Sequence, residues 1–298
     1  MIILLVAVLL IAGCERTPDP PSAVPAQEPI HVLGTVYALA DLARQIGGKY
    51  AVVDWVVESG QSLTGMQGTP ELRDRLRRAD FLVAGGITEP WVVEGSGDPT
   101  GVGNLVRMDS LAPEIARIES SADLWLDPVV AQQLCDELAR RFSTVRPQHE
   151  AYFRANADRV KQQLASLTRE YMDRLGALPT RKAISLSPEF DLLAQRFNII
   201  LVRTFNGAPE LLTDAQVRQL RDDGALHDVG CLIISTDTPD AIARDLSNRA
   251  SLRPVALDAY GSSAAAARGT YQELLRFNLQ GLFEALETDA RARARPSR

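Results

Sequence analysis

Apolar runs of strand length alternate with helical stretches along most of the chain. The runs fall into two groups of four, at 30–34, 51–57, 81–84 and 105–108 and then at 182–186, 199–203, 231–235 and 254–258. Short apolar runs separated by helical patterns are typical of βαβ units, in which the strands form parallel sheets. The pattern therefore predicts an α/β protein with two such series.

The stretches between these runs carry helical stripes and, in two places, a marked helix start. Residues 36–46 place their apolar side chains on one helical face. Thr69 and Asp127 are each followed directly by proline, and a capping side chain before a proline is typical of a helix N-terminus. We therefore expect helices to begin after these two residues, and a last helix to cover 270–286.

A long helical segment, roughly 147–175, separates the two groups of strands. Its apolar residues recur every three or four positions: Phe153, Ala157, Val160, Leu164, Leu167, Tyr171 and Leu175. This spacing places them on one face of a helix, which at 1.5 Å per residue would be about 40 Å long, the width of a domain. We expect it to bridge two lobes rather than lie inside one of them.

These elements set the expected domain boundaries. The N-terminal α/β lobe covers 29–145, the bridging helix 146–178 and the C-terminal α/β lobe 179–287. The last segment, 288–298, alternates Arg with Ala before Pro296 and is predicted to be disordered. The predicted fold is two parallel-sheet βα lobes joined by one long bridging helix, with the ligand cleft between the lobes.

The N-terminus begins with an unbroken apolar run at 2–12 that ends in Ala12-Gly13-Cys14. The run is too short for a membrane span, which needs roughly 20 apolar residues, and it fits the apolar part of an export signal. Cysteine after small residues resembles the lipobox of bacterial lipoproteins. The resemblance implies that 1–13 is a signal peptide, that Cys14 carries the lipid, and that 14–28 is a Pro-rich tether. We expect a periplasmic or otherwise extracytoplasmic protein, lipid-anchored to a membrane.

The composition is that of an ordinary globular protein, with 46% hydrophobic and 23% charged residues. The formal net charge of -6 gives no reason to expect a nucleic-acid partner, which favours a basic face. Cys135 lies in a helical pattern, and Cys231 begins an apolar run far away in the sequence. We expect two buried free thiols, and a disulfide in an oxidising compartment is the alternative.

Recognisable catalytic signatures are missing from the sequence. It contains no G-x-S-x-G nucleophile elbow and no HExxH metalloprotease motif. The glycine pair at 101–103 lacks the third glycine of a dinucleotide-binding loop and does not lie between a strand and a helix. We therefore expect a protein that is not an enzyme and holds no organic cofactor.

A series of short motifs gives a more specific indication. They lie at 38–43, 46–48, 60–70, 79–83, 89–91, 125–128, 257–258, 270–271 and 277–279, with Tyr152 and Asn156 in the long helix. In this order and spacing they resemble the periplasmic zinc and manganese solute-binding proteins of bacterial ABC importers, over nearly the whole chain after the tether. The resemblance implies a monomer that captures a divalent metal ion, zinc or manganese, as cargo and delivers it to an ABC permease and ATPase complex.

The metal ligands that the resemblance implies are mostly replaced. The family holds its metal between the lobes on three histidine-type positions and a carboxylate. Here Thr64, Asp123 and Ser187 stand at the three histidine-type positions, and only Asp258 matches a family ligand. The histidines of this chain, His31, His149 and His227, lie elsewhere, and the family's His-rich acidic loop is absent.

Three interpretations of the cleft stay open. First, Asp123, Asp258 and Glu189 form an oxygen site for a hard cation such as Mn²⁺, Mg²⁺ or Ca²⁺, with Thr64 and Ser187 lining the cleft. Second, the cleft holds another ligand, such as a metal already bound by a small chelator. Third, the protein has lost binding and serves as an accessory or scaffold lipoprotein.

Each carboxylate also has a simpler structural explanation. Asp123 can cap a turn before the following helix, and Glu189 lies one register from the coordinating position, which also fits a solvated surface acid. Asp258 ends an apolar strand, and ligands of open α/β sheets bind at the carboxyl ends of the strands. We therefore expect a ligand role most strongly at Asp258.

Overall fold

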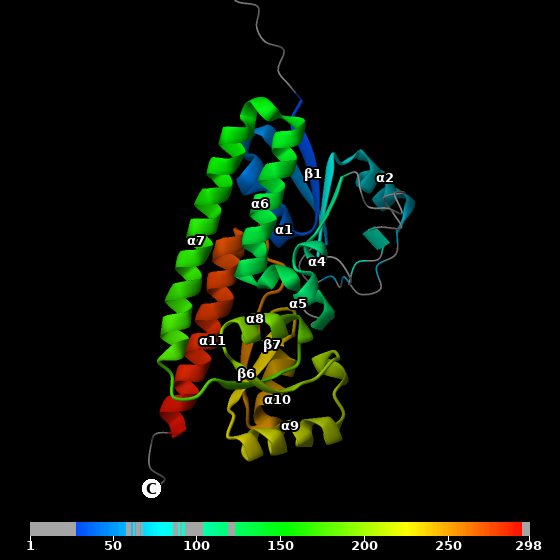
Figure 1. Cartoon of the computed structure of the whole chain (residues 1–298). Helices are drawn as coiled ribbons and strands as arrows, with labels where there is room; N and C mark the ends of the chain where they lie inside the picture. The colour runs from blue at the N-terminus through cyan, green and yellow to red at the C-terminus, as the bar shows by residue number, and fades with distance from the viewer. Residues whose placement is uncertain are drawn as a thin grey trace, which may run out of the picture.

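The structure is a computed structural model that describes residues 28–57, 61, 63, 66, 68–85, 89, 91–92, 104–118 and 123–293. Two α/β lobes lie end to end, and a long helix runs along both of them (Figure 1). The first strand begins at the outer end of one lobe, and the last helix ends at the outer end of the other. The predicted two-lobe α/β fold is confirmed.

The N-terminal lobe is built on a parallel four-stranded sheet in the order β2-β1-β3-β4. Its strands are β1 (Ile30–Val36), β2 (Ala51–Val57), β3 (Phe81–Ala84) and β4 (Leu105–Arg107). Its helices are α1 (Tyr37–Gly47), α2 (Pro70–Arg78), α4 (Met108–Leu111), α5 (Pro113–Ile118) and α6 (Pro128–Val145), with short 3-10 turns η1 (Gly48–Tyr50) and η2 (Leu124–Leu126). Helix α1 packs on β1, β2 and β3.

The C-terminal lobe repeats this arrangement. Its strands β5 (Lys182–Ser185), β6 (Ile200–Thr204), β7 (Cys231–Ser235) and β8 (Arg253–Leu257) form a parallel sheet in the order β6-β5-β7-β8. Its helices are α8 (Asp191–Arg196), α9 (Asp214–His227), α10 (Asp240–Ala250) and α11 (Tyr271–Arg293), with 3-10 turns η4 (Pro188–Phe190), η5 (Pro209–Leu211) and η6 (Ala266–Arg268). Helix α11 packs on β7 and β8, while α9 and α10 pack together beside β6 and β8. All eight predicted strands are present, with ends shifted by no more than two residues.

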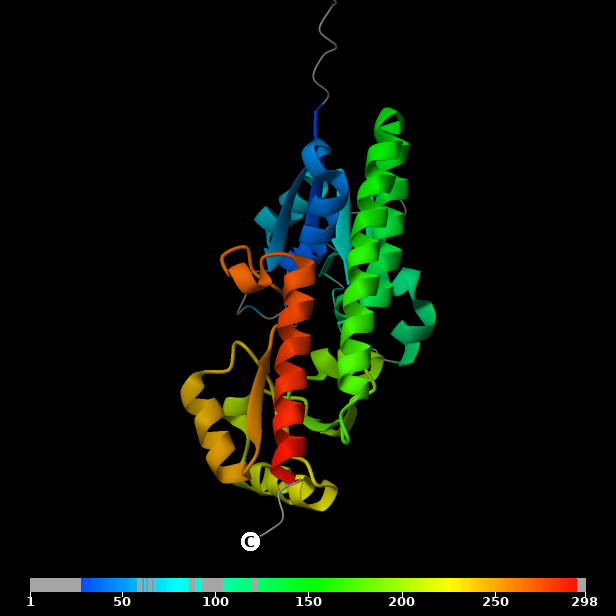
Figure 2. The same cartoon turned by 90° about the vertical axis from the view of Figure 1, so that its left-hand side faces the viewer.

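The predicted bridging helix is α7 (Glu150–Gly176), which follows a 3-10 turn, η3 (Pro147–His149). Its buried residues are the seven that the periodicity places on one face. Through this face α7 packs on α1 and α6 in one lobe and on α11, which runs beside it into the other lobe (Figure 2). One continuous apolar core therefore extends through both lobes, and a smaller cluster lies on the α9–α10 side of the second sheet.

Local sequence fixed the helix starts as predicted. The Thr69 hydroxyl accepts a hydrogen bond from the Leu72 N–H at 3.2 Å at the start of α2. The Asp127 carboxylate accepts one from the Val129 N–H at 2.8 Å at the start of α6. In both helices proline occupies the first turn, where its missing N–H needs no partner.

The predicted disorder of 288–298 is wrong for its first six residues, because α11 continues to Arg293. Asp289 and Ala290 are buried, and the Asp289 carboxylate accepts a hydrogen bond from the Gly230 N–H at 3.0 Å. This contact with the start of β7 holds the last turns of the helix, which composition alone does not reveal. Residues 294–298 lie outside the described part of the chain.

The two cysteines in the described ranges, Cys135 and Cys231, are buried and free, as predicted. Burial raises the pKa of each thiol to about 12, so neither forms an appreciable amount of thiolate at neutral pH.

No helix in the described ranges is long and apolar enough to cross a bilayer. The predicted lipidation site, Cys14, lies outside the described residues.

Candidate ligand site between the lobes

A cavity of about 420 Å³ lies at the carboxyl ends of the C-terminal strands. The loops that follow all four of these strands contribute to its wall, and Gln61 reaches it from the N-terminal lobe. Ser187 and Glu189 from the β5 loop and Tyr260 from the β8 loop are among its lining residues. The cavity therefore lies where open α/β sheets bind their ligands, as the sequence predicts.

Asp123, in the N-terminal lobe, contacts the Glu189 loop beside this cavity, although it does not itself line the cavity. It is 4% exposed, and the N–H of its backbone donates to the Glu189 carbonyl across the lobes at 3.5 Å. Its side chain makes no capping hydrogen bond to η2, so the explanation of Asp123 as a turn cap is wrong. The buried Oδ2 atom of Asp123 and the buried Oε2 atom of Glu189 both lack a hydrogen-bond partner.

The electrostatic environment of Asp123 is strongly unfavourable for its charge. Burial raises the pKa of this carboxyl well above its usual range, and the negative charges of Glu189 and Glu89 raise it further. Burial also raises the pKa of the Tyr260 hydroxyl, with contributions from the same Asp123 and Glu189 charges. The two lobes thus bring acidic groups together with no cation among the groups that shift the pKa of Asp123.

Glu89 is a site residue to which the sequence argument gave no role. It is 1% exposed, and its Oε2 atom accepts a hydrogen bond from the Gly85 N–H at 2.7 Å at the end of β3. Gly85 is required there because a Cβ atom would come within 2.4 Å of the Trp125 ring. In the sequence, Glu89 belongs to the Glu89-Pro90-Trp91 motif. This motif indicated the family resemblance but did not indicate a role for Glu89 in the site.

Asp258 does not present the open carboxylate that its position predicts. Its Oδ2 atom forms an ion pair with the Arg268 Nη1 atom at 2.8 Å. Its Oδ1 atom accepts hydrogen bonds from the N–H groups of Tyr260 and Gly261, at 2.9 and 3.0 Å. The Asp258 backbone is in turn held by the side-chain amide of Asn278. Both oxygens are therefore engaged, and the predicted role of Asp258 as a free ligand needs correction.

The remaining predicted positions give a mixed result. Ser187 lines the cavity and is fixed by mutual hydrogen bonds with Ser185. Thr64 lies outside the described residues. Within the described ranges, no group of three or more His, Cys, Asp or Glu side chains could hold a metal ion. Asp123, Asp258 and Glu189 therefore do not form the expected three-carboxylate centre, and the structure brings only Asp123 and Glu189 together.

Several contacts fix the two lobes around the site. The Trp125 indole N–H donates to the Ala259 carbonyl at 2.7 Å, and the Tyr271 hydroxyl donates to the Trp125 carbonyl. On the other side of the lobe junction, Asp127 is fully buried and forms an ion pair with Arg196 at 2.6 Å. These contacts join the two lobes next to the Asp123 and Glu189 loops.

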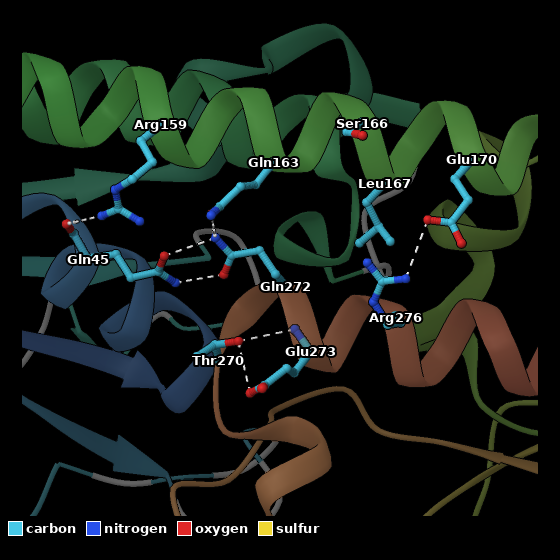
Figure 3. A pocket seen from close by; sticks show the side chains of 10 residues that line it. All are labelled: Gln45, Arg159, Gln163, Ser166, Leu167, Glu170, Thr270, Gln272, Glu273 and Arg276. Carbon is cyan, nitrogen blue, oxygen red and sulfur yellow. Dashed lines mark hydrogen bonds and ion pairs between the residues drawn. The ribbon is translucent and has the colours of Figure 1, made fainter.

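A second cavity, of about 560 Å³, lies elsewhere, between α1, α7 and α11 (Figure 3). Gln272 bridges Gln45 and Gln163 through side-chain hydrogen bonds of 2.7 and 2.8 Å. Arg276 pairs with Glu170 at 3.4 Å. Because these polar side chains bind one another, we assign this groove to the joining of the three helices and not to ligand binding.

Comparison with known sequences gives one family and several distant relatives. The family described as "ZnuA: Zinc-uptake complex component A periplasmic" matches residues 32–285. The high-affinity zinc uptake system protein ZnuA of Bacillus subtilis (strain 168) is 21% identical over 263 residues, which are 80% of this chain and 82% of that protein. The protein of the same name from Paracoccus denitrificans (strain Pd 1222) is 24% identical over 167 residues, 55% of this chain and 51% of its own length. This last match spans about half of that relative.

Solved structures share the fold over most of their length. The Zn(II)-bound ZnuA-like domain of Streptococcus pneumoniae AdcA has a TM-score of 0.75 at 18% identity, covering 87% of this chain and 99% of that domain. The metal-dependent lipoprotein YcdH from Bacillus subtilis also has a TM-score of 0.75 at 18% identity, covering 86% and 99%. At this identity the likeness establishes the two-lobe architecture and leaves the ligand to be argued from the site.

Proposed function

The chain belongs to the ZnuA family of periplasmic zinc-uptake components, and from that premise we propose that it captures a metal ion between its lobes for an ABC importer. The cargo would pass to a membrane permease driven by an ATPase. The protein has a binding role, with no chemical step. Its expected location outside the cytoplasm agrees with the family and with the apolar run before Cys14.

One observation supports the cargo site most directly. Asp123 and Glu189, from different lobes, each keep a buried carboxylate oxygen with no hydrogen-bond partner. Buried charges that lack a counter-charge are unfavourable, and a divalent cation between these oxygens would neutralise both. Glu89 adds negative charge beside Asp123. The lobe junction is therefore an electrostatically favourable place for a cation.

The donor atoms favour a hard cation over zinc. Zinc sites in proteins rely on histidine and cysteine, and neither residue lines the cavity in the described part of the chain. Carboxylate oxygens suit Mn²⁺, Mg²⁺ and Ca²⁺. A small hard cation held by one or two carboxylates keeps several waters, which the cavity has room to hold. We propose Mn²⁺ as the preferred cargo among transition metals.

We further propose that Cys14 carries the lipid anchor and that 14–28 tethers a monomeric protein to the membrane. Support comes from the apolar run and the small residues before Cys14. Mass spectrometry of the membrane-associated protein would detect the acylated N-terminal cysteine. Cys14→Ala should lack the acylated N-terminal peptide, and a wild-type protein whose mature N-terminus is not an acylated Cys14 would contradict the proposal.

Metal analysis of the purified protein, combined with thermal melts and calorimetric titration, tests the function. Mn²⁺ at a hundred times the Kd should stabilise the protein by about 2.7 kcal/mol, and the advantage of Zn²⁺ over Mn²⁺ in affinity should be smaller than at a histidine site. Asp123→Asn and Glu189→Gln should each abolish the effect. Glu210→Gln, which removes an exposed charge from the neighbouring η5 turn, is the matched control and should bind normally. If no ion copurifies and none shifts the melt, metal capture is wrong.

The size of the cavity favours one second candidate. A volume of about 420 Å³ exceeds what a bare ion requires and has room for a metal bound by a small oxygen-rich chelator. Titration with Mn²⁺ in the presence and absence of citrate would separate the two. Tighter binding with citrate would favour the chelated cargo.

A further inference from the structure

Asp258 stands at the position that the family resemblance marks as a metal ligand, yet both of its carboxylate oxygens already have partners. Its side chain is 3% exposed, with Arg268 on one oxygen and two backbone N–H groups on the other. A metal bound to Asp258 would have to displace the guanidinium or share the carboxylate with it. Two cations on one buried carboxylate repel each other strongly, because interior charges are poorly screened.

Arg268 is not a mobile surface side chain that leaves this position easily. It ends the short turn η6, and its backbone N–H donates to the Ala265 carbonyl at 2.8 Å. Its own carbonyl accepts a hydrogen bond from the Ser262 N–H at 3.2 Å. The guanidinium lies over the Phe277 ring, 5.3 Å from its centroid, and the side chain is 23% exposed. Backbone and side chain are thus both held.

The loop that carries both partners is attached to the opposite lobe. The Ala38 N–H donates to the Tyr260 carbonyl at 2.9 Å, and the Tyr37 hydroxyl donates to the Gly269 carbonyl at 2.6 Å. Gly261 turns this loop with a φ of 74°, in the left-handed region that favours glycine. Because α1 holds the loop on both sides of the ion pair, moving Arg268 away would break contacts between the lobes.

We propose that Arg268 is a permanent counter-ion that excludes the cargo from Asp258 and so determines which groups bind it. This inference rests on the proposed function, since it concerns the same cleft. In this protein the metal is held from the Asp123 and Glu189 side, and Asp258 has become a structural residue of the β8–α11 loop. Because Arg268 occupies Asp258, the metal preference of this chain should differ from that of a site in which Asp258 binds the metal.

A double-mutant cycle with Mn²⁺ as the probe tests the inference. Asp258→Asn keeps an oxygen for the Tyr260 and Gly261 N–H groups but removes the charge. It should raise the Kd for Mn²⁺ by no more than about tenfold, the electrostatic effect of one removed negative charge, whereas loss of a direct ligand should weaken binding by more than about a hundredfold. Arg268→Gln should tighten binding by about tenfold or more, because it frees Asp258 and removes a nearby positive charge. Arg268→Lys should keep the wild-type Kd.

The double variant Asp258→Asn/Arg268→Gln separates the two causes of that gain. If Asp258 becomes a ligand, the gain from Arg268→Gln should largely disappear in the Asp258→Asn background. Thermal melts without metal show whether each variant folds. If Arg268→Gln does not fold, the Asp258→Asn measurement tests the inference by itself. Loss of Mn²⁺ binding in Asp258→Asn, or no gain in a folded Arg268→Gln protein, would overturn the inference.

The outcomes for the function and for the inference are distinct. A wild-type protein that binds no metal would refute the proposed capture of a bare ion. If Arg268→Gln then gained Mn²⁺ binding, the exclusion by Arg268 would stand. If neither protein bound Mn²⁺, both would be wrong.

Discussion

Replacing Asp123 with asparagine should make the metal-free protein more stable while removing its metal response. Asp123 is 4% exposed and has a buried oxygen without a partner. Asparagine has nearly the same shape, carries no charge, and offers an N–H group to the neighbouring carboxylates. The substitution should therefore relieve an unfavourable interaction, although most substitutions of buried residues destabilise a protein.

The expected size follows from the burial of this one carboxyl. Every unit by which the folded-state pKa exceeds the unfolded value costs about 1.4 kcal/mol at pH values above both. Leaving a buried acceptor without its hydrogen bond costs about 1–3 kcal/mol. Because both costs describe the same group they are not additive, and we expect Asp123→Asn to raise the free energy of unfolding by about 1–3 kcal/mol at about pH 8.

The stability difference between the Asp123→Asn variant and the wild type should depend on pH. The pKa of Asp123 is raised in the folded protein, mainly by burial, so the folded state binds the proton more tightly than the unfolded state. The wild type should lose stability as pH rises from about 4 through the raised pKa, and the variant should lack this contribution. The advantage of the variant should therefore be small at about pH 5 and larger at about pH 8.

Urea unfolding in the presence of a chelator, at both pH values, provides the measurement. The same experiment with Mn²⁺ should stabilise the wild type by about 2.7 kcal/mol at a hundredfold excess over the Kd and leave the variant unchanged. A variant that is less stable than the wild type at both pH values, or whose difference does not vary with pH, would refute the electrostatic reasoning. Retained Mn²⁺ binding would remove Asp123 from the site.

The other predictions concern the scaffold. Asp127→Ala removes both a helix cap and a partly buried ion pair between the lobes, and should cost about 2–4 kcal/mol in chemical unfolding; Asp74→Ala, at an exposed ion pair, should leave the unfolding midpoint nearly unchanged. Leu164→Ala on the fully buried face of α7 should cost about 2–5 kcal/mol by the same assay, and a loss below 1 kcal/mol would contradict the packing. Cys135 and Cys231, with thiol pKa values of about 12, should react with a thiol reagent only after denaturation; rapid labelling of the native protein would contradict their burial.

The continuous core bears on how a cargo could enter. Helix α7 packs on both lobes, and the apolar core runs through the junction. Wide hinge opening would expose this core, whereas loops at the carboxyl ends of the strands can move without doing so. We therefore expect binding to involve local rearrangement around Asp123 and Glu189, with little change in the angle between the lobes.

The sequence by itself determined the elements whose signals are local. The sequence predicted the strands, the capped starts of α2 and α6, and the buried face of α7. These features could be predicted because residues that are close in the sequence determine them. The end of α11 was not readable, because Asp289 is held by Gly230, which lies 59 residues earlier. Local composition there predicts a frayed tail, and only the contact with the other segment makes it helical.

The tertiary structure decided how the site is built. Its residues come from loops that lie far apart in the sequence, and although the family resemblance placed Asp123 and Glu189 in one cleft, no periodicity or spacing indicates that the charge of Glu89 also acts on Asp123. The position of Asp258 at the end of a strand was predictable, but its engagement by Arg268 depends on how the η6 turn folds back. The physical reason is the same in each case. The role of a carboxylate depends on the charges and N–H groups around it, and the packing of the loops determines which groups these are.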